Sequence, residues 1–279
     1  MPFIQTRDGH SLFVKHWGDR VSPGPTVVLI HGWPLCSDSF DHLALHLSLA
    51  GYRVLAYDRR GFGRSDQPFD GYTYDTLSDD LADVMGSSGV DDAVLIGFSM
   101  GGGEVVRYAS RHGGKHMVAA GLIGSVTPFL LKTDDHPEGV DGSVFESMKD
   151  GIRADRAAFF AGFFKNFYGV TDDNAAVSQP CLQWTRQMAM RAGLKATLDC
   201  VDAFGRTDFR DDLKAIGVPT LILHGTEDLA VPIEISGDQT AKQIADADVI
   251  RYDGGPHGLL VTHQDEVAGD VLNFLSTLN

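Results

Sequence analysis

The chain has 279 residues, of which 43% are apolar, so it can bury one large core and is not a short peptide-like scaffold. Its 38 acidic and 23 basic residues give a net charge of −15, which opposes binding to nucleic acid and to anionic membrane surfaces. The three cysteines are odd in number and far apart, which predicts neither a disulfide framework nor a CxxC metal site: Cys36, Cys181 and Cys200.

The chain opens without a targeting signal. MPFIQTRDGH has no basic segment followed by an apolar one, and no window approaches the apolar length of a membrane span. We therefore expect a soluble, cytoplasmic protein with no membrane partner. Residues 3–6 and 11–17 have strand patterns on either side of Asp8 and Gly9, which predicts an antiparallel pair at the edge of a sheet.

After a breaker-rich stretch at 22–25, short apolar runs alternate with helical patterns. This alternation indicates an α/β fold with a mostly parallel sheet of about eight strands, flanked by helices. The predicted strands of this region are 27–30, 54–57, 93–96, 118–123, 220–223 and 249–252, and the predicted helices are 41–50, 76–87, 101–111 and about 263–275.

Between residues 124 and 216 the strand signal fades, while helix formers and aromatic residues accumulate. We expect a single domain over 1–279, in which residues 125–215 form a helical cap inserted late in the sheet. Five phenylalanines in this region follow a spacing that places their rings on one side of a helix. We expect these rings to form the core of the cap, and some to wall a pocket beneath it: Phe159, Phe160, Phe163, Phe164 and Phe167.

The segment GFSMGGGEV, residues 97–105, places four glycines and one serine between a predicted strand and a predicted helix. It lacks the lysine of a phosphate loop, and the GxGxxG pattern of dinucleotide binding fails both here and at residues 61–66. It matches the nucleophile elbow, GxSxG, with Ser99 as the nucleophile. The flanking glycines prevent collisions between strand and helix, and Gly102 and Gly103 are expected to let the helix approach neighbouring strands.

A serine nucleophile needs an acid and a base, and the elbow fold orders them as serine, then Asp or Glu, then His. HGTEDLAVP follows the strand 220–223, and its Asp228 is the predicted acid. GGPHG places His257 between the last strand and the last helix, at the carboxyl edge of the sheet, so His257 is the predicted base. The weaker alternatives are Glu227 and Asp202 for the acid, and His224 and His263 for the base.

Two backbone N–H groups are expected to stabilise the oxyanion of the tetrahedral intermediate. One belongs to Met100, directly after the nucleophile. The other comes from the loop HGWPL at 31–35, where Trp33 is the best candidate because Pro34 has no N–H. We expect His31, at the end of the preceding strand, to brace this loop.

Together these residues resemble the α/β-hydrolase superfamily and, within it, the bacterial family of cofactor-free haloperoxidases, perhydrolases and arylesterases. Haloalkane dehalogenases and epoxide hydrolases share the fold, but their nucleophile is aspartate where this chain has Ser99. The resemblance covers nearly the whole chain and rests on HGWPL at 31–35, YDRRGFGRSDQP at 57–68, YTYDTLSDDL at 72–81, GFSMGGGEVVRY at 97–108, HGTEDLAVP at 224–232 and PHGLLVTH at 256–263.

The resemblance implies the same triad and the same two oxyanion donors, and it implies a structural turn at 58–63. It also implies that no metal, haem or other cofactor takes part. The serine attacks an ester, and water or hydrogen peroxide accepts the acyl group; peroxide yields a peracid that oxidises halide in free solution. Members that favour perhydrolysis tend to have a proline in the position of Pro34. Relatives often form homo-oligomers, and the residues of this chain do not decide the matter.

The leading hypothesis is a serine hydrolase that cleaves small aryl or alkyl esters through an acyl-enzyme and also has perhydrolase activity. Two alternatives stay open: a lactam or amide hydrolase with the same triad, and a receptor of this fold that senses a small ligand. The substrate pocket is expected to be narrow and apolar, with four candidate lining residues: Phe129, Phe159, Trp184 and Leu259.

Overall fold

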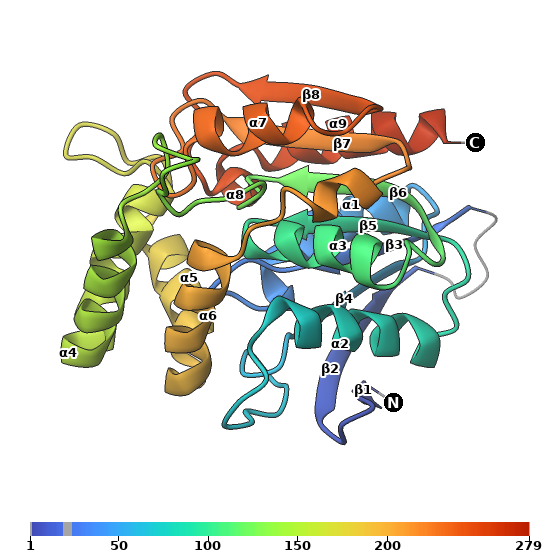
Figure 1. Cartoon of the computed structure of the whole chain (residues 1–279), viewed down its shortest axis with the longest axis horizontal. Helices are drawn as coiled ribbons and strands as arrows, with labels where there is room; N and C mark the ends of the chain where they lie inside the picture. The colour runs from blue at the N-terminus through green and yellow to red at the C-terminus, as the bar shows by residue number, and fades with distance from the viewer. Residues whose placement is uncertain (1, 19–23, 279) are drawn as a thin grey trace.

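A computed structural model describes residues 2–18 and 24–278, so Ser22 and Pro23 of the breaker-rich stretch lie outside the described residues. The described chain folds around one eight-stranded sheet, which confirms the expected α/β class (Figure 1). Antiparallel pairing is limited to β1 with β2 and β2 with β4, and the other pairs of neighbouring strands are parallel. In spatial order the strands are β1 (Phe3–Gln5), β2 (Ser11–Trp17), β4 (Val54–Tyr57), β3 (Thr26–Ile30), β5 (Ala93–Phe98), β6 (Met117–Ile123), β7 (Thr220–Gly225) and β8 (Ala247–Tyr252).

Helices cover both faces of the sheet, as continuous apolar strands require. α1 (Asp41–Leu49) contacts α9 (Gln264–Thr277) on one face, and α2 (Tyr74–Ser87) contacts α3 (Met100–Arg111) on the other (Figure 1). Every residue of β3, β4 and β5 is buried between these layers. The carboxyl ends of the parallel strands meet at one edge, so the loops after β3, β5, β6, β7 and β8 can converge there.

Three α-helices lie between β6 and β7 in the chain and pack together beside this edge (Figure 1). α4 (Gly142–Phe167) contacts both α5 (Gln179–Met190) and α6 (Leu194–Arg206). α4 is bent at Asp155, whose φ of −157° and ψ of 93° interrupt the helix. The Asp155 carboxylate accepts a hydrogen bond from the Ala158 N–H at 2.9 Å, so it caps the second half of α4.

The remaining elements are short and connect the layers. None of the helices in the described part of the chain has the length and apolar character needed to cross a membrane. The short elements that complete the fold are η1 (Ser37–Phe40), η2 (Asp212–Ala215), η3 (Ile233–Ile235), α7 (Gly237–Ala241) and α8 (Leu259–Thr262).

Candidate active site

Ser99 forms the sharp turn between β5 and α3. Its φ of 54° and ψ of −119° are rare for a residue with a side chain and mark a strained backbone. The two glycines of the motif have no room for a Cβ: one added at Gly97 would overlap the Gly101 carbonyl, and one at Gly101 would overlap the Ile30 carbonyl. The glycines therefore permit the close approach that holds Ser99 in this conformation.

The next two glycines also stand at close contacts, although not with strands. A Cβ at Gly102 would overlap the side chain of Ser125, in the segment after β6. One at Gly103 would lie 2.6 Å from the Phe209 ring and 2.8 Å from the Tyr74 ring. These two glycines therefore allow close packing of α3, but against a loop and aromatic side chains and not against the expected strands.

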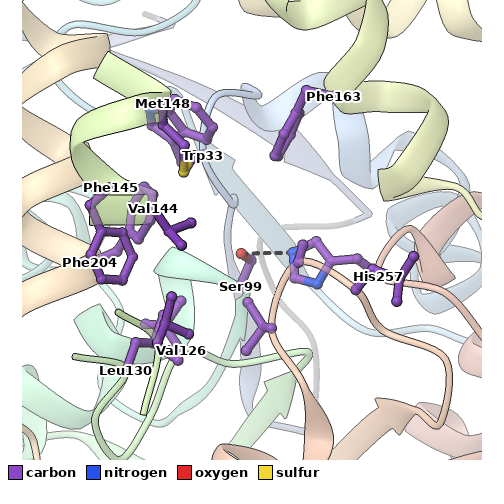
Figure 2. A pocket seen from close by; sticks show the side chains of 14 residues that line it. Trp33, Ser99, Val126, Leu130, Val144, Phe145, Met148, Phe163, Phe204 and His257 are labelled. Carbon is purple, nitrogen blue, oxygen red and sulfur yellow. Dashed lines mark hydrogen bonds between the residues drawn. The ribbon is translucent and has the colours of Figure 1, made fainter. Parts of the chain in front are cut away.

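The structure brings Ser99, His257 and Asp228 into one chain of hydrogen bonds. The His257 Nε2 lies 2.9 Å from the Ser99 Oγ (Figure 2), and its Nδ1 lies 2.6 Å from the Asp228 Oδ2. The three residues are 6%, 2% and 5% exposed, in that order. With a proton on Nδ1, the ring donates to the carboxylate and presents Nε2 as the acceptor of the serine proton.

The loop after β7 fixes the Asp228 carboxylate. Its Oδ1 accepts hydrogen bonds from the N–H groups of Ala230 and Val231, at 2.9 and 2.8 Å. Burial raises the pKa of Asp228, but the electrostatic interaction with His257 and hydrogen bonds from His224 and His257 lower it by a larger amount, so the pKa lies well below its ordinary value. The carboxylate is therefore ionised at neutral pH.

The two weaker acids lie elsewhere. Glu227 is exposed, whereas the three residues of the hydrogen-bonded chain are buried. Asp202 is on α6, where it pairs with Lys149 at 2.8 Å and Arg206 at 3.0 Å. Neither contacts His257, so the geometry favours Asp228.

The other histidines near the sheet edge have structural contacts. His31 donates from Nδ1 to the Gly32 carbonyl at 2.9 Å and accepts the Arg59 N–H on Nε2 at 2.9 Å. Burial, with the Arg59 charge, lowers the pKa of His31 to about 3, so it is neutral and braces the loop. The remaining two bond to neighbours: His224 Nε2 lies 2.8 Å from the Val231 carbonyl, and His263 Nδ1 lies 2.9 Å from the Thr262 Oγ1.

The loop after β3 runs directly beside the nucleophile. A Cβ at Gly32 would lie 3.0 Å from the Ser99 Cβ. The Trp33-Pro34 peptide bond of the same loop is cis. The Trp33 indole donates from Nε1 to the Thr197 carbonyl of α6 at 3.0 Å, which anchors the loop. Met100 is the first residue of α3, and the first N–H groups of a helix have no partner within the helix. Met100 thus follows Ser99 directly in the chain, and Trp33 follows the glycine that approaches the Ser99 side chain.

A buried network lies beneath this loop, at the turn 58–63 that the resemblance implied, but its hydrogen bonds and ion pairs were not predicted from the sequence. Arg59 donates to Glu104 of α3 at 2.8 Å and to the His31 carbonyl at 2.6 Å, and its side chain is fully buried, like that of Glu104. Asp58, also fully buried, accepts from the Ser37 N–H at 2.9 Å and from the Arg64 Nε at 2.8 Å. The turn 58–63 thus ties the loop after β3 to α3. Charged residues directly after an apolar strand were the available signal.

An apolar pocket of about 150 Å³ opens onto Ser99 and His257 (Figure 2). Its walls come from the segment after β6, from α4 and α6, and from the loop that carries Asp228. Apart from Ser99, His257 and the hydrogen-bonded Trp33 indole, its lining side chains are hydrocarbon or thioether: Val126, Leu130, Val140, Val144, Phe145, Met148, Phe163, Phe204, Leu229, Ala230 and Val231.

The four lining residues expected from the sequence are wrong for this pocket, since none of them is among its lining residues. Phe129 contacts the Arg210 guanidinium on the outer side of the segment after β6. Phe159 stacks on Phe163, whose ring does reach the pocket. Trp184 is 40% exposed on α5, and Leu259 is fully buried in the core.

The five phenylalanines in the second half of α4, at 159–167, do more than fill the cap. Phe160 and Phe163 pack against the Trp33 ring, with ring centroids 5.7 and 5.4 Å apart. Phe167 contacts the His257 ring edge to face at 4.9 Å. The aromatic side of α4 therefore packs against the loops that carry Trp33 and His257.

One group among the described residues could hold a metal ion. His42 and His46 of α1 and Asp265 of α9 offer ligand atoms within 4.8 Å of one another, and His42 Nε2 lies 3.0 Å from the Asp265 Oδ1. This group belongs to the helices on one face of the sheet and not to the loops that carry the triad.

Comparison with known proteins gives consistent results. The sequence pattern of the alpha/beta hydrolase fold family matches residues 25–264. A putative non-heme chloroperoxidase of Synechocystis is 44% identical over 99% of this chain and 100% of its own length. A bifunctional esterase/perhydrolase of Acinetobacter calcoaceticus is 41% identical over 99% of both chains. The crystal structure of a bromoperoxidase from Bacillus anthracis superposes with a TM-score of 0.93 and 42% identity, covering 98% of this chain and 99% of that one.

Proposed function

The chain belongs to the alpha/beta hydrolase family, and from this premise we propose that it is a serine hydrolase that cleaves small carboxylic esters through an acyl-enzyme on Ser99. One observation carries the proposal. The hydrogen-bonded chain from Ser99 through His257 to Asp228 ends in an apolar pocket, so its nucleophile faces a space suited to a small neutral molecule.

In the first half of the reaction, the Ser99 oxygen attacks the ester carbonyl as His257 takes its proton on Nε2. Asp228 stabilises the resulting imidazolium and holds the ring in the required tautomer. The N–H groups of Trp33 and Met100 donate to the oxyanion of the tetrahedral intermediate. His257 then returns the proton to the leaving alcohol, and the acyl group stays on Ser99.

In the second half, the acyl acceptor determines the product. Water attacks the acyl-enzyme and releases the carboxylic acid, with His257 again moving the proton. Hydrogen peroxide in place of water gives a peracid and the free serine, and the peracid oxidises halide to hypohalous acid while it returns to the carboxylic acid. The close relatives named as chloroperoxidase and as esterase/perhydrolase support this second outcome.

The test compares the wild type with Ser99→Ala and with Ser87→Ala, a control at an exposed serine at the end of α2. Each protein is mixed with a short-chain aryl acetate and, in parallel, with acetate, bromide and peroxide, all in EDTA. We expect the wild type and Ser87→Ala to cleave the ester, and to brominate only when both acetate and peroxide are present, and Ser99→Ala to do neither.

Equal ester cleavage by Ser99→Ala would overturn the proposal. Failure of all three folded proteins to cleave the ester would redirect the assignment to a lactam or other amide substrate. One slow turnover that ends in a stable adduct would favour the receptor.

A further inference from the structure

A single methionine among the described residues lines the Ser99 pocket. Met148 lies on the first half of α4, one turn from Val144, and it is half-buried. Figure 2 draws its thioether among the side chains that surround Ser99 and His257. The pocket is small, so a molecule released from Ser99 has the Met148 sulfur as one of its neighbours.

The proposed chemistry makes an oxidant at this place. A peracid transfers its terminal peroxy oxygen to a thioether: the O–O bond breaks, an S–O bond forms, the sulfur loses two electrons, and the peracid becomes the carboxylic acid. The balance needs no other reagent, because hydrogen peroxide and the acyl group have already supplied the peracid.

We propose that Met148 is a site of self-modification, which the peracid product oxidises to methionine sulfoxide before it leaves the pocket. This inference rests on the proposed perhydrolase activity. The oxidation of Met148 limits that activity, because enzyme that makes peracid oxidises a residue of its own pocket wall, whereas enzyme that only hydrolyses esters does not.

The consequence follows from the surroundings of the sulfur. The Trp33 indole N–H already donates to the Thr197 carbonyl, and the aliphatic and phenyl side chains of the pocket wall offer no hydrogen-bond donor for a sulfoxide oxygen. A polar group without a hydrogen-bond partner is unfavourable in apolar surroundings, and it weakens the binding of an apolar substrate beside it. We therefore expect oxidised enzyme to have a raised KM for apolar esters, and methionine sulfoxide reductase to restore it.

The chain contains a matched reporter for oxidant in bulk solution. Met190, at the end of α5, is 38% exposed and does not line the pocket. A peracid that escapes into solution reaches Met190 at least as readily as the half-buried Met148. The ratio of oxidation at the two positions therefore separates oxidation inside the pocket from oxidation after release.

The experiment incubates the wild type, Ser99→Ala and Met148→Leu with acetate and peroxide, with and without excess free methionine as a scavenger of released peracid. Peroxide alone is the blank. Peptide mass spectrometry measures the added oxygen at Met148 and Met190, a colorimetric assay measures peracid, and residual esterase activity is expressed relative to each protein's own starting value.

We expect Met148 of the wild type to gain oxygen even with the scavenger, while Met190 is protected. In Ser99→Ala, which makes no peracid, Met148 stays a thioether. Met148→Leu, a substitution that nearly conserves volume, keeps its own starting activity several-fold longer than the wild type does.

Two outcomes are distinguishable failures. If the wild type forms no peracid, the proposed perhydrolysis is wrong and the inference falls with it. If peracid forms and Met148 stays unoxidised, or is oxidised equally in Ser99→Ala, only the inference is wrong.

Discussion

The Nδ1 atom of His257 lies 2.6 Å from the Oδ2 atom of Asp228, and both side chains are almost completely buried. The other carboxylate oxygen is held by two backbone N–H groups, so the carboxylate cannot rotate away from the ring without losing them. The acid therefore fixes both the position and the tautomer of the base.

Replacing Asp228 with Asn removes the charge and keeps the shape. The amide cannot stabilise the imidazolium, and it favours the wrong tautomer of His257, so we expect kcat for an aryl acetate to fall roughly 10⁴-fold. Asp202→Asn is the control, because Asp202 pairs with Lys149 and Arg206 outside the site. Stopped-flow or steady-state ester cleavage measures both; a loss below ten-fold for Asp228→Asn would contradict the assigned role.

Asp58 should make the stability of the fold depend on acid pH. Burial raises the pKa of this carboxyl, but hydrogen bonds from Arg64 and Ser37 lower it below the ordinary value. Its charged form therefore stabilises the fold above the unfolded pKa of about 4, and this stability is lost as the pH falls through the folded pKa. Urea unfolding should show Asp58→Asn less stable than the wild type by about 3 kcal/mol at pH 7.

The difference between the two proteins should shrink as the pH falls below about 4, where the unfolded carboxyl is protonated. A difference that stays constant from pH 7 to pH 3 would show that the Asp58 charge is not responsible.

Two glycine substitutions should act in opposite directions. Gly101→Ala places a Cβ against the Ile30 carbonyl, so we expect a loss of about 3 kcal/mol or a failure to fold. Gly162→Ala, on the exposed side of α4, meets no atom within 4 Å and should stabilise the protein by about 0.5–1 kcal/mol. Thermal unfolding compares the two, and equal melting temperatures would refute the packing argument.

Phe163→Ala should widen the pocket. The Phe163 ring lines it beside Trp33, and its removal leaves space for a longer acyl or alcohol chain. We expect the ratio of kcat/KM for a hexanoate ester to that for an acetate ester to rise about ten-fold. Trp184→Ala, an exposed position outside the pocket, should leave this ratio unchanged. An equal change in both variants would mean that α4 and α5 act only through the stability of the cap.

The sequence was sufficient to predict the features that depend mainly on residues close together in the chain. All eight strands and the flanking helices α1, α2, α3 and α9 appear at the predicted positions within a few residues, because each is coded by a local apolar period. The turn at Ser99 is marked by its own five-residue motif, although only Gly97 avoids a carbonyl group nearby in the chain; Gly101 avoids that of Ile30 on β3.

The pocket could not be predicted in the same way, because it depends on how the cap helices sit on the sheet. α4 is bent at Asp155, and both halves contribute lining residues, Phe145 and Met148 before the bend and Phe163 after it; no period in the sequence marks that bend. Two lining segments did carry a signal: Val126 and Leu130 follow β6, and Leu229 follows the acid, so both segments leave the sheet at the edge where Ser99 lies.

The four consecutive residues 228–231 limit how the substrate specificity of this protein can be changed. Ala230 and Val231 hold the acid with their N–H groups, while their side chains and that of Leu229 wall the pocket. A mutation in this loop that makes room for a larger molecule therefore also disturbs the acid, and the two effects oppose each other. Directed evolution for new substrates should accumulate its successful changes on α4 and α6, and it should leave this loop almost untouched.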